Sequence, residues 1–217
     1  MWMERSGLAE NKIATVEDND LKWVLLCQKG DVEAFGILVE RYQKKMLNVA
    51  YRMTGDYEES CEVVQDAFLA AFRTIKKFRG EARFSTWLYG IVINSTKNRL
   101  KQLKRDKSRF WHAGDNPGDP GDGAIDGFDC LAASGSGQQE SLLEHLEKKE
   151  LEAGVQKCIG LLESDHREIL ILRDIQGLSY DEIVTILKIP PGTVRSRLFR
   201  ARIALKDLLL ARIGEFS

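Results

Sequence analysis

The sequence predicts an all-α protein of two small helical domains joined by a flexible linker. Three observations carry this prediction. Apolar residues recur at spacings of three and four over most of the chain, which is the period of a helix with one buried face. Residues that cap helices stand at the boundaries of these stretches. Between Trp111 and Gln139 the chain is rich in Gly, Asp, Pro and Ser, a composition that buries too little apolar surface to form a core.

Length and composition fit an ordinary globular chain. The 217 residues are 43% apolar and 30% charged, which allows one domain or two small ones without disulfide support. No apolar run approaches the roughly 20 residues that a membrane span needs, and the start of the chain lacks the apolar stretch of a secretory signal. We therefore expect a cytoplasmic protein with no membrane insertion.

The first domain, residues 20–109, is expected to follow a loose leader at residues 1–19. A short helix comes first and closes at Gly30. Asp31 can cap the second helix, in which apolar residues recur every three or four positions. Gly55 ends that helix.

Two further helices complete the first domain. Asp56 and Glu59 form a capping pattern for the third helix, whose apolar stripe indicates one buried face. The segment 78–82 breaks this helix. A fourth helix begins near Ser85 and runs into a strongly basic stretch.

The second domain, residues 141–213, follows an acidic linker at 110–140 that is rich in Gly, Pro and Ser. Its first helix is expected from Ser141 to about Gly160. Ser164 can cap the next helix, which stops at Gly177, a residue suited to a left-handed backbone.

The last two predicted helices form a helix-turn-helix unit. Ser179 and Glu182 make a capping box for a short helix. The segment Ile189–Gly192 contains two prolines and forces a turn, after which Thr193 can cap a longer helix. Two helices with a tight turn between them, the second of them basic, match a unit that binds DNA.

Charge is distributed in blocks, although the net charge is only -1. From Arg73 to Arg109 there are 12 lysines and arginines and only two acids, Glu81 and Asp106. From Phe110 to Glu140 there are six acids and no lysine or arginine. A basic face raises the local potential whatever the net charge, so near-neutrality does not exclude a nucleic-acid partner.

The last predicted helix has one apolar face and one basic face. Val194, Leu198 and Ala201 fall on a single face and are expected in the core. The polar side chains near the helix start then lie where a recognition helix meets base edges in the major groove. No acid occurs from Lys188 to Lys206, which favours DNA binding over the commoner alternative of a solvated basic helix. The candidate contacts on this face are Arg195, Ser196, Arg197 and Arg200.

A second nucleic-acid signal surrounds the start of the fourth helix. Aromatic residues are interleaved with basic ones there, a mixture on which single-stranded bases stack and with which phosphates pair. Stacking would favour opened DNA. The alternative is that Phe84, Trp87 and Leu88 are core residues at helical spacing. A core position does not explain the basic segment from Lys97 to Arg109, because its positive side chains surround the helix.

The third helix is acidic over its first half. Acids in a first turn are expected from the helix dipole, so Asp56 to Glu59 need no further role. Glu62, Gln65 and Asp66 lie further into the helix and could meet a basic partner protein.

No sequence motif indicates catalysis. The chain contains no P-loop, nucleophile elbow, H-E-x-x-H motif or dinucleotide fingerprint. Its four cysteines never pair as C-x-x-C, and no histidine completes a ligand pattern with them. Cys130 could have a redox role, but a simple thiol is the expected state of all four. We expect no enzyme activity, no catalytic residue, no metal and no cofactor.

Two long motifs in this chain resemble the sigma-70 family of bacterial transcription initiation factors. The first contains EVVQDAFLAAFRTIKKFRGEARFSTWLYGIVINSTKNRLK, and the second, after the acidic spacer, is LRDIQGLSYDEIVTILKIPPGTVRSRLFRARIAL. The resemblance covers about residues 20–109 and 145–210. It is strongest to the extracytoplasmic-function group, which keeps only the second and fourth sigma domains.

The resemblance implies partners as well as a fold. It implies binding to core RNA polymerase through the clamp helices of the beta-prime subunit and the beta flap, and delivery of the enzyme to promoter DNA. EVVQDAF matches the clamp-binding segment, which makes Glu62, Gln65 and Asp66 candidate polymerase contacts. An anti-sigma factor is a further partner expected from the group.

The resemblance also assigns two DNA-contact regions. FRGEARFSTWLYGIVINSTKNR matches the part that melts and reads the downstream promoter element, where a flipped base would be held near residues 78–84. TVRSRLFRAR matches the recognition helix for the upstream element. The downstream candidates are Phe78, Arg79, Phe84, Trp87, Asn94, Lys97, Asn98 and Arg99. The upstream candidates are Thr193, Arg195, Ser196, Arg197, Arg200 and Arg202, with Arg173 as a phosphate contact.

The chain departs from the family pattern in a few places. Gly90 stands where a basic residue is usual after W-L-Y, and should loosen that helix by up to about 1 kcal/mol relative to alanine. Lys188 replaces the customary glycine at the turn, and Pro191 follows Pro190 where a small apolar residue is usual. The linker is long and acidic for the group, and one hypothesis is that it occupies the basic polymerase or DNA-binding channels before DNA arrives.

Two other classes of protein remain as alternatives. A stand-alone helix-turn-helix repressor or activator would select its operator without polymerase, as a dimer on a palindrome. It leaves EVVQDAF and the aromatic basic helix unexplained. A protein-interaction adaptor with incidental basic helices predicts no salt-sensitive DNA binding.

Overall fold

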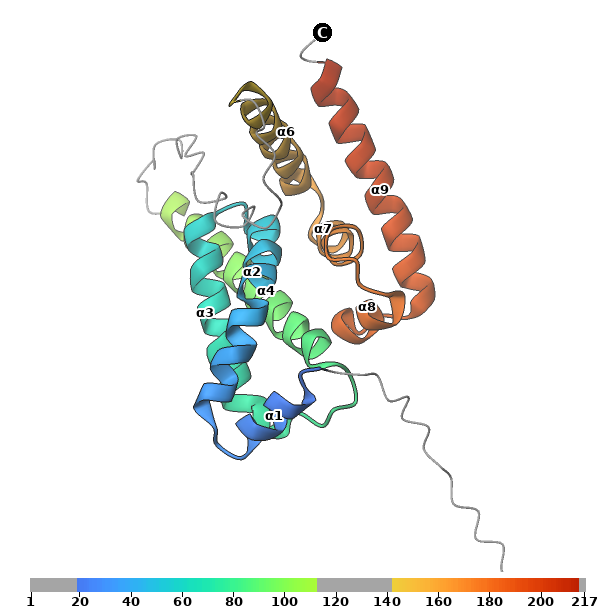
Figure 1. The fold of residues 1–217 in the computed structure, drawn as a ribbon. Helices are drawn as coiled ribbons and strands as arrows, with labels where there is room; N and C mark the ends of the chain where they lie inside the picture. Colours follow the sequence, from blue (N-terminus) through green and yellow to red (C-terminus); the bar gives the residue numbers. More distant parts are fainter. Residues whose placement is uncertain (1–18, 113–141, 215–217) are drawn as a thin grey trace, which may run out of the picture.

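A computed structural model describes residues 19–112 and 142–214, and every regular element within these two ranges is a helix (Figure 1). The helices form two groups, one before and one after the gap, which confirms the predicted all-α fold of two helical domains. The predicted leader, apart from Asn19, and almost all of the predicted linker lie outside the described residues. The fourth helix of the first group continues to His112, beyond the expected domain end at residue 109.

The first group is built around α2, which packs against both α3 and α4. α1 lies across one end of α2, and a short 3-10 helix follows α3 (Figure 1). The elements are α1 (Leu21–Gln28), α2 (Val32–Thr54), α3 (Tyr57–Thr74), η1 (Ile75–Lys77) and α4 (Phe84–His112).

The predicted caps of the first group are confirmed. The Asp31 carboxylate accepts a hydrogen bond from the Ala34 backbone N–H at 3.0 Å, at the start of α2. Asp56 accepts from the Glu59 N–H at 2.9 Å, at the start of α3. Gly55 takes the left-handed backbone that ends α2, with φ at 77°. Each cap satisfies backbone groups that the helix itself leaves without a partner.

Gly90 gives a test of helix propensity. It lies inside α4, and a Cβ added there would meet no atom of a packed neighbour within 4 Å. Because glycine in a helix interior costs up to about 1 kcal/mol relative to alanine, Gly90→Ala should raise the free energy of unfolding by up to that amount. Urea denaturation measures it.

The matched control is Gly80→Ala, at a residue that also has open space but a φ of 73°. This left-handed backbone disfavours a Cβ, so the control should lower the free energy of unfolding. Destabilisation by Gly90→Ala would contradict the prediction.

The second group contains α6, α7 and the two helices of the helix-turn-helix. A π-helical segment continues α7 before the turn at Gly177, whose φ of 71° confirms the predicted left-handed stop. α9 packs mainly against α7, and also against α8 and α6. The elements are α6 (Leu142–Leu161), α7 (Ser164–Leu170), η3 (Ile171–Ile175), α8 (Tyr180–Leu187) and α9 (Pro191–Gly214).

The caps of the second group are confirmed at α8 and wrong at α7 and α9. Ser179 and Glu182 form the predicted capping box. Ser164 is the first residue of α7, and the cap position is Glu163, which makes no side-chain cap bond. Thr193 lies inside α9 because the helix begins at Pro191. Proline suits the first helical position, since its fixed φ is helical and its missing N–H would have no partner there.

Lys188 ends α8 in a left-handed conformation, with φ at 54° and ψ at 43°. It is the only non-glycine residue with a positive φ in the described ranges. Its backbone N–H donates to the Val184 carbonyl at 2.8 Å, as a C-terminal glycine does in other helices. This turn therefore needs a left-handed backbone, which glycine adopts freely. Lysine adopts it at a cost in backbone strain.

The two groups of helices pack against each other. α8 lies beside the start of α4 in Figure 1, and α2 contacts α6, α7 and η3. The buried apolar residues of both groups form one continuous cluster. The sequence indicated separate domains on a tether and did not indicate this contact.

Candidate nucleic-acid and polymerase interfaces

α9 divides into a buried face and an exposed basic face near its start. Val194, Leu198 and Ala201 are buried, as predicted. Arg195, Ser196 and Arg200 are exposed, and Thr193 is partly buried. Within the described residues neither Arg195 nor Arg200 forms an ion pair. The two guanidinium groups are therefore available to an external anion or base edge.

Arg197 and Arg202 are engaged with acids of their own domain. Arg197 Nη2 lies 3.0 Å from Asp165 Oδ2. Arg202 donates to both carboxylate oxygens of Asp174, at 2.9 and 2.6 Å. The hydrogen bond to Asp174 raises the pKa of Arg202 above its usual value, as expected for a bidentate pair.

Arg173 of η3 is held against the turn before α8 and the first residue of that helix. Its Nη1 donates to the Leu178 carbonyl at 2.6 Å, and its guanidinium lies 5.0 Å from the centre of the Tyr180 ring. These contacts fix the turn before α8. Among the upstream candidates, Arg195, Ser196 and Arg200 are thus free to contact DNA as the protein stands.

The aromatic residues before and at the start of α4 form a stacked cluster. The Phe84 ring is completely buried and lies beneath Phe78 and Trp87, with ring centres 6.1 and 5.7 Å away. Phe78 and Trp87 are partly exposed. Gln28 holds this segment by donating to the carbonyls of Ile75 and Phe78, at 3.0 and 2.9 Å. The structure places Phe84 in the core, so of these three rings only Phe78 and Trp87 present a surface.

The polar downstream candidates, on α4 and in the segment before it, differ in whether they are already paired with an acid. Asn94 and Asn98 are exposed. Arg79 is exposed, with only a loose 3.8 Å contact to Glu81. Lys97 reaches an acid of the other domain, Glu168, at 2.9 Å.

Arg99 is bound to α3. It donates to both oxygens of Glu59 and to Glu62 Oε2, the last at 2.8 Å. The hydrogen bond to Glu59 raises the pKa of Arg99. Arg99 therefore links the candidate downstream helix to the candidate polymerase helix.

The three polymerase candidates lie on the outer surface of α3. Glu62, Gln65 and Asp66 are all exposed, which agrees with a role in contacting a partner. Within the described residues, Glu62 is the one of the three that forms an ion pair, with Arg99.

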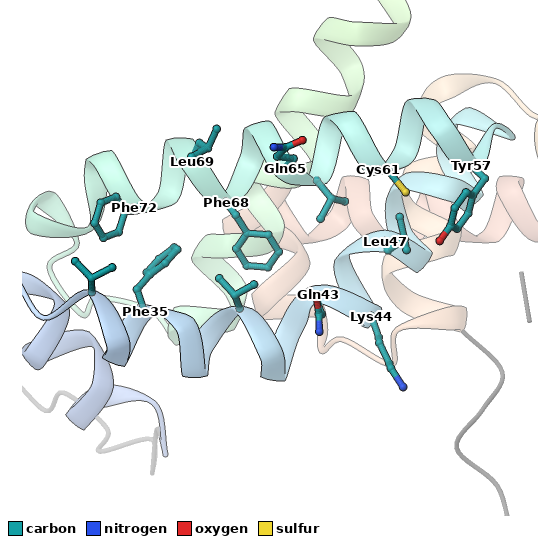
Figure 2. Close-up of a pocket in the computed structure, with 13 residues that line it drawn as sticks. Phe35, Gln43, Lys44, Leu47, Tyr57, Cys61, Gln65, Phe68, Leu69 and Phe72 are labelled. Carbon is teal, nitrogen blue, oxygen red and sulfur yellow. The ribbon is translucent and has the colours of Figure 1, made fainter. Parts of the chain in front are cut away.

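An apolar groove beside these residues was not predicted. It runs between α2 and α3, has a volume of about 660 Å³, and includes Gln65 in its wall (Figure 2). Phe72 and Leu69 line it and remain 38% and 46% exposed. The signal in the sequence was Leu69, an apolar residue outside the buried stripe of its helix. The other lining residues are Val32, Phe35, Val39, Gln43, Lys44, Leu47, Tyr57, Cys61, Val64 and Phe68.

A buried acid between the domains was also missed. Glu168 on α7 is 2% exposed and faces Lys97 and Arg197. Burial raises the pKa of Glu168, although the Lys97 hydrogen bond acts in the opposite direction. The signal was a charged residue within the apolar run REILIL, where an acid is seldom buried without a partner.

Within residues 19–112 and 142–214, no cluster of His, Cys, Asp and Glu has the arrangement of a metal site. In the same ranges no helix is both long and apolar enough to span a bilayer.

Comparison with known families matches both helical groups. The family described as Sigma-70 region 2 matches residues 38–106, and Sigma-70, region 4 matches residues 152–205. The first match contains the acidic face of α3 and most of α4, and the second contains the helix-turn-helix.

Comparison with individual proteins agrees. The chain is 38% identical to the RNA polymerase sigma-H factor of Pseudomonas aeruginosa, over 92% of this chain and 98% of the relative. It is 39% identical to the ECF RNA polymerase sigma-E factor of Escherichia coli, over 83% of this chain and 88% of the relative.

Solved structures share the fold. CnrH, solved in complex with the cytosolic domain of CnrY, is 22% identical with a TM-score of 0.61, over 88% of this chain and 97% of that one. The sigma factor RpoE from Bartonella quintana, solved with the anti-sigma factor NepR, is 22% identical with a TM-score of 0.57, over 82% of this chain and 98% of that one. The family matches and the sequence identities together show that this chain belongs to the sigma-70 family of RNA polymerase sigma factors, in its extracytoplasmic-function group.

Proposed function

We propose that this sigma factor binds core RNA polymerase through α3, reads the upstream promoter element with the start of α9, and opens the downstream element with α4 and the segment before it. The observation that carries the proposal is the separation of three exposed surfaces on one chain. α3 presents acids, α9 presents free arginines, and the start of α4 presents rings beside cations. The acids suit a basic protein partner, the free arginines suit duplex DNA, and the rings beside cations suit opened DNA.

The upstream surface consists of Arg195, Ser196 and Arg200 at the start of α9. A recognition helix contacts bases with its first turns, and an arginine fork can pair with guanine. Arg197, Arg202 and Arg173 would join them as phosphate contacts once their intramolecular partners give way. Thr193 is close enough along the helix to take part.

The downstream surface consists of Phe78, Trp87, Arg79, Asn94 and Asn98. A flipped base would stack on the partly exposed rings of Phe78 and Trp87. Phe84 supports these rings from below. Lys97 and Arg99 would add phosphate contacts when released from Glu168 and from α3.

The polymerase surface consists of Glu62, Gln65 and Asp66 with the neighbouring groove of α2 and α3. Exposed acids would attract a basic partner. The apolar groove would bury the partner's side chains at the centre of the interface. The beta-prime clamp helices are the proposed partner here. The beta flap is proposed to contact the second domain, and an anti-sigma factor is a further proposed partner.

This function needs no catalytic group of its own, because polymerase performs the chemistry. The sigma factor is proposed to act in the cytoplasm, where polymerase and promoter meet.

Transcription from a promoter library tests the proposal. Purified chain, core polymerase and the library should give specific transcripts that are absent without the chain. Sequence-specific DNA binding without polymerase, and no such transcripts, would instead favour a stand-alone repressor or activator. No transcripts and no salt-sensitive DNA binding would favour an adaptor.

Asp66→Ala tests the polymerase surface. Removing this exposed acid should weaken binding to core polymerase by up to about 1 kcal/mol, with a smaller loss at high salt, because a charge at the rim of an interface is screened by ions. Fluorescence titration of labelled chain with core polymerase measures it. Glu40→Ala is the control, since Glu40 is an exposed acid of α2 that does not line the groove. Equal losses in both variants would contradict a specific role for Asp66.

A further inference from the structure

The turn of the helix-turn-helix contains a residue whose backbone does not suit its side chain. Lys188 follows α8 with φ at 54° and ψ at 43°, in the left-handed region. Gly55 and Gly177 have similar φ values of 77° and 71°, and glycine takes them without a steric penalty. In lysine the Cβ approaches the following carbonyl oxygen, which costs stability. The fold alone therefore favours glycine at this position.

Packing within the chain does not account for the lysine. The Lys188 side chain is exposed, so it buries little apolar surface. Its backbone N–H donates to the Val184 carbonyl at 2.8 Å, and glycine would donate the same bond. The apolar contact of the turn comes from the next residue, Ile189, which packs against the core. Neither the core nor the end of α8 needs a lysine side chain here.

Ion pairing within the chain does not account for the lysine either. Within residues 19–112 and 142–214, Lys188 forms no ion pair. The preceding acid, Glu182, lies at the other end of α8 and accepts hydrogen bonds from Ser179. The next acid along the chain is Asp207, far along α9. The positive charge of Lys188 is therefore available to another molecule.

Lys188 lies beside the proposed upstream surface. α9 begins three residues later, at Pro191, and the exposed Arg195 is about one turn further along. Figure 1 shows the connection between α8 and α9 at the lower end of α9. An α-helix with its side chains is about 10–12 Å across, and the major groove is about 12 Å wide. A helix that enters the groove therefore has phosphates along both sides, within reach of a cation in the preceding turn.

We propose that Lys188 is a phosphate contact of the upstream DNA surface, and that the turn keeps a strained lysine for this contact. The inference deepens the proposed function and rests on one part of it, namely that the start of α9 enters the major groove. Strained backbone conformations persist where a function retains them. A phosphate contact adds affinity on every sequence and carries no base preference. Lys188 thus adds affinity to whichever bases Arg195 and Arg200 read.

The experiment compares three variants of Lys188 in the full chain. Lys188→Gly removes the charge and the strain, Lys188→Asn removes the charge at a backbone that asparagine tolerates, and Lys188→Arg keeps the charge. Lys206→Ala is the matched control, because Lys206 is also exposed but lies about three turns beyond Arg195 on α9. Urea denaturation gives the midpoint of unfolding. Anisotropy of a labelled random-sequence duplex, from low to physiological salt, gives DNA affinity.

We expect Lys188→Gly to change stability and DNA binding in opposite directions. It should unfold at a higher urea concentration than the wild type, because relief of the strained Cβ exceeds the extra backbone entropy that glycine loses on folding. It should bind the duplex about two- to ten-fold more weakly, with a salt slope of log affinity that is shallower by about 0.9. Lys188→Asn should lose the same affinity. Lys188→Arg should bind like the wild type, and Lys206→Ala should lose much less.

Several results would overturn the proposal. If Lys188→Gly were more stable but kept the affinity and salt slope of the wild type, the strain would serve no DNA contact. If Lys188→Gly were less stable, the lysine would be structural. An equal loss of affinity in Lys206→Ala would show an effect of net charge and not of a contact at Lys188. A wild type that does not bind the duplex even at low salt would reject the contact without any variant.

Arg195→Ala in the same assay separates this inference from the proposed function. If Arg195→Ala weakens DNA binding and Lys188→Gly does not, only the Lys188 contact fails. If neither variant changes DNA binding, the start of α9 does not bind DNA, and the proposed upstream surface fails together with the Lys188 contact. Polymerase-dependent transcripts from the wild type test the sigma activity independently of both variants.

Discussion

Replacing Phe84 by alanine is expected to lower the free energy of unfolding by about 3 to 5 kcal/mol, the usual loss for a buried phenylalanine. The ring is fully buried and lies 5.9, 6.1 and 5.7 Å from the ring centres of Tyr42, Phe78 and Trp87. Removing it leaves a cavity among these rings, which the helices can close only in part. Urea denaturation of the whole chain measures the loss.

Phe84→Leu is the control for a packing role, since it keeps most of the apolar volume and should cost much less. Trp87→Ala is the control for a role at the DNA, because Trp87 is partly exposed. It should impair promoter opening more than stability. A Phe84→Ala chain that unfolds like the wild type but fails to open promoters would contradict the core assignment, and would restore Phe84 as a base contact.

Replacing Arg195 by alanine is expected to weaken use of the upstream element by about 1 to 3 kcal/mol if its guanidinium pairs with a base. Arg195 is exposed at the start of α9 and forms no ion pair within the described residues. Transcription from promoters that differ at single upstream positions measures both the loss and its sequence dependence. The loss should be concentrated at one position.

Arg202→Ala is the contrasting variant. Arg202 is already paired with Asp174 through two hydrogen bonds, so DNA must compete for it, and the loss should be smaller and equal across sequences. If Arg195→Ala also caused equal losses on every sequence, Arg195 would be a phosphate contact. If it caused none, the exposed basic face of α9 would not bind DNA.

Local features of this fold were predictable from the sequence because they depend on neighbours along the chain. Asp31, Asp56 and Ser179 cap helices through backbone groups only three residues away. Where the prediction failed, another local preference prevailed. Pro191 starts α9 and so moves Thr193 inside the helix.

The contact between the domains was not predictable in the same way. Glu168 and Gln176 bond to partners 71 and 128 residues away in the sequence, Lys97 and Asn48. No periodicity or spacing marks such pairs, and a polar residue near a helix end usually indicates solvent. The same limit explains the groove of α2 and α3, since two partly exposed side chains become a groove only when two helices are placed together.

Contacts between residues far apart in the sequence also decide which candidate site residues are exposed. The sequence predicted which helices carry the acids, rings and cations, and the family assignment of these helices is confirmed. It could not separate exposed from engaged members of each set. Arg195 and Arg197 are two residues apart, yet only Arg197 reaches the acids of α7.

Glu182 has two roles that couple local order to assembly. Its Oε2 accepts from the backbone and hydroxyl of Ser179, at 2.9 and 2.8 Å, while its Oε1 accepts from Thr86 of the other domain. The carboxylate that starts α8 is therefore held in its rotamer by α4. When the domains separate, the first turn of α8 loses this contact with α4. The backbone amide hydrogens of that turn should then exchange with solvent more readily.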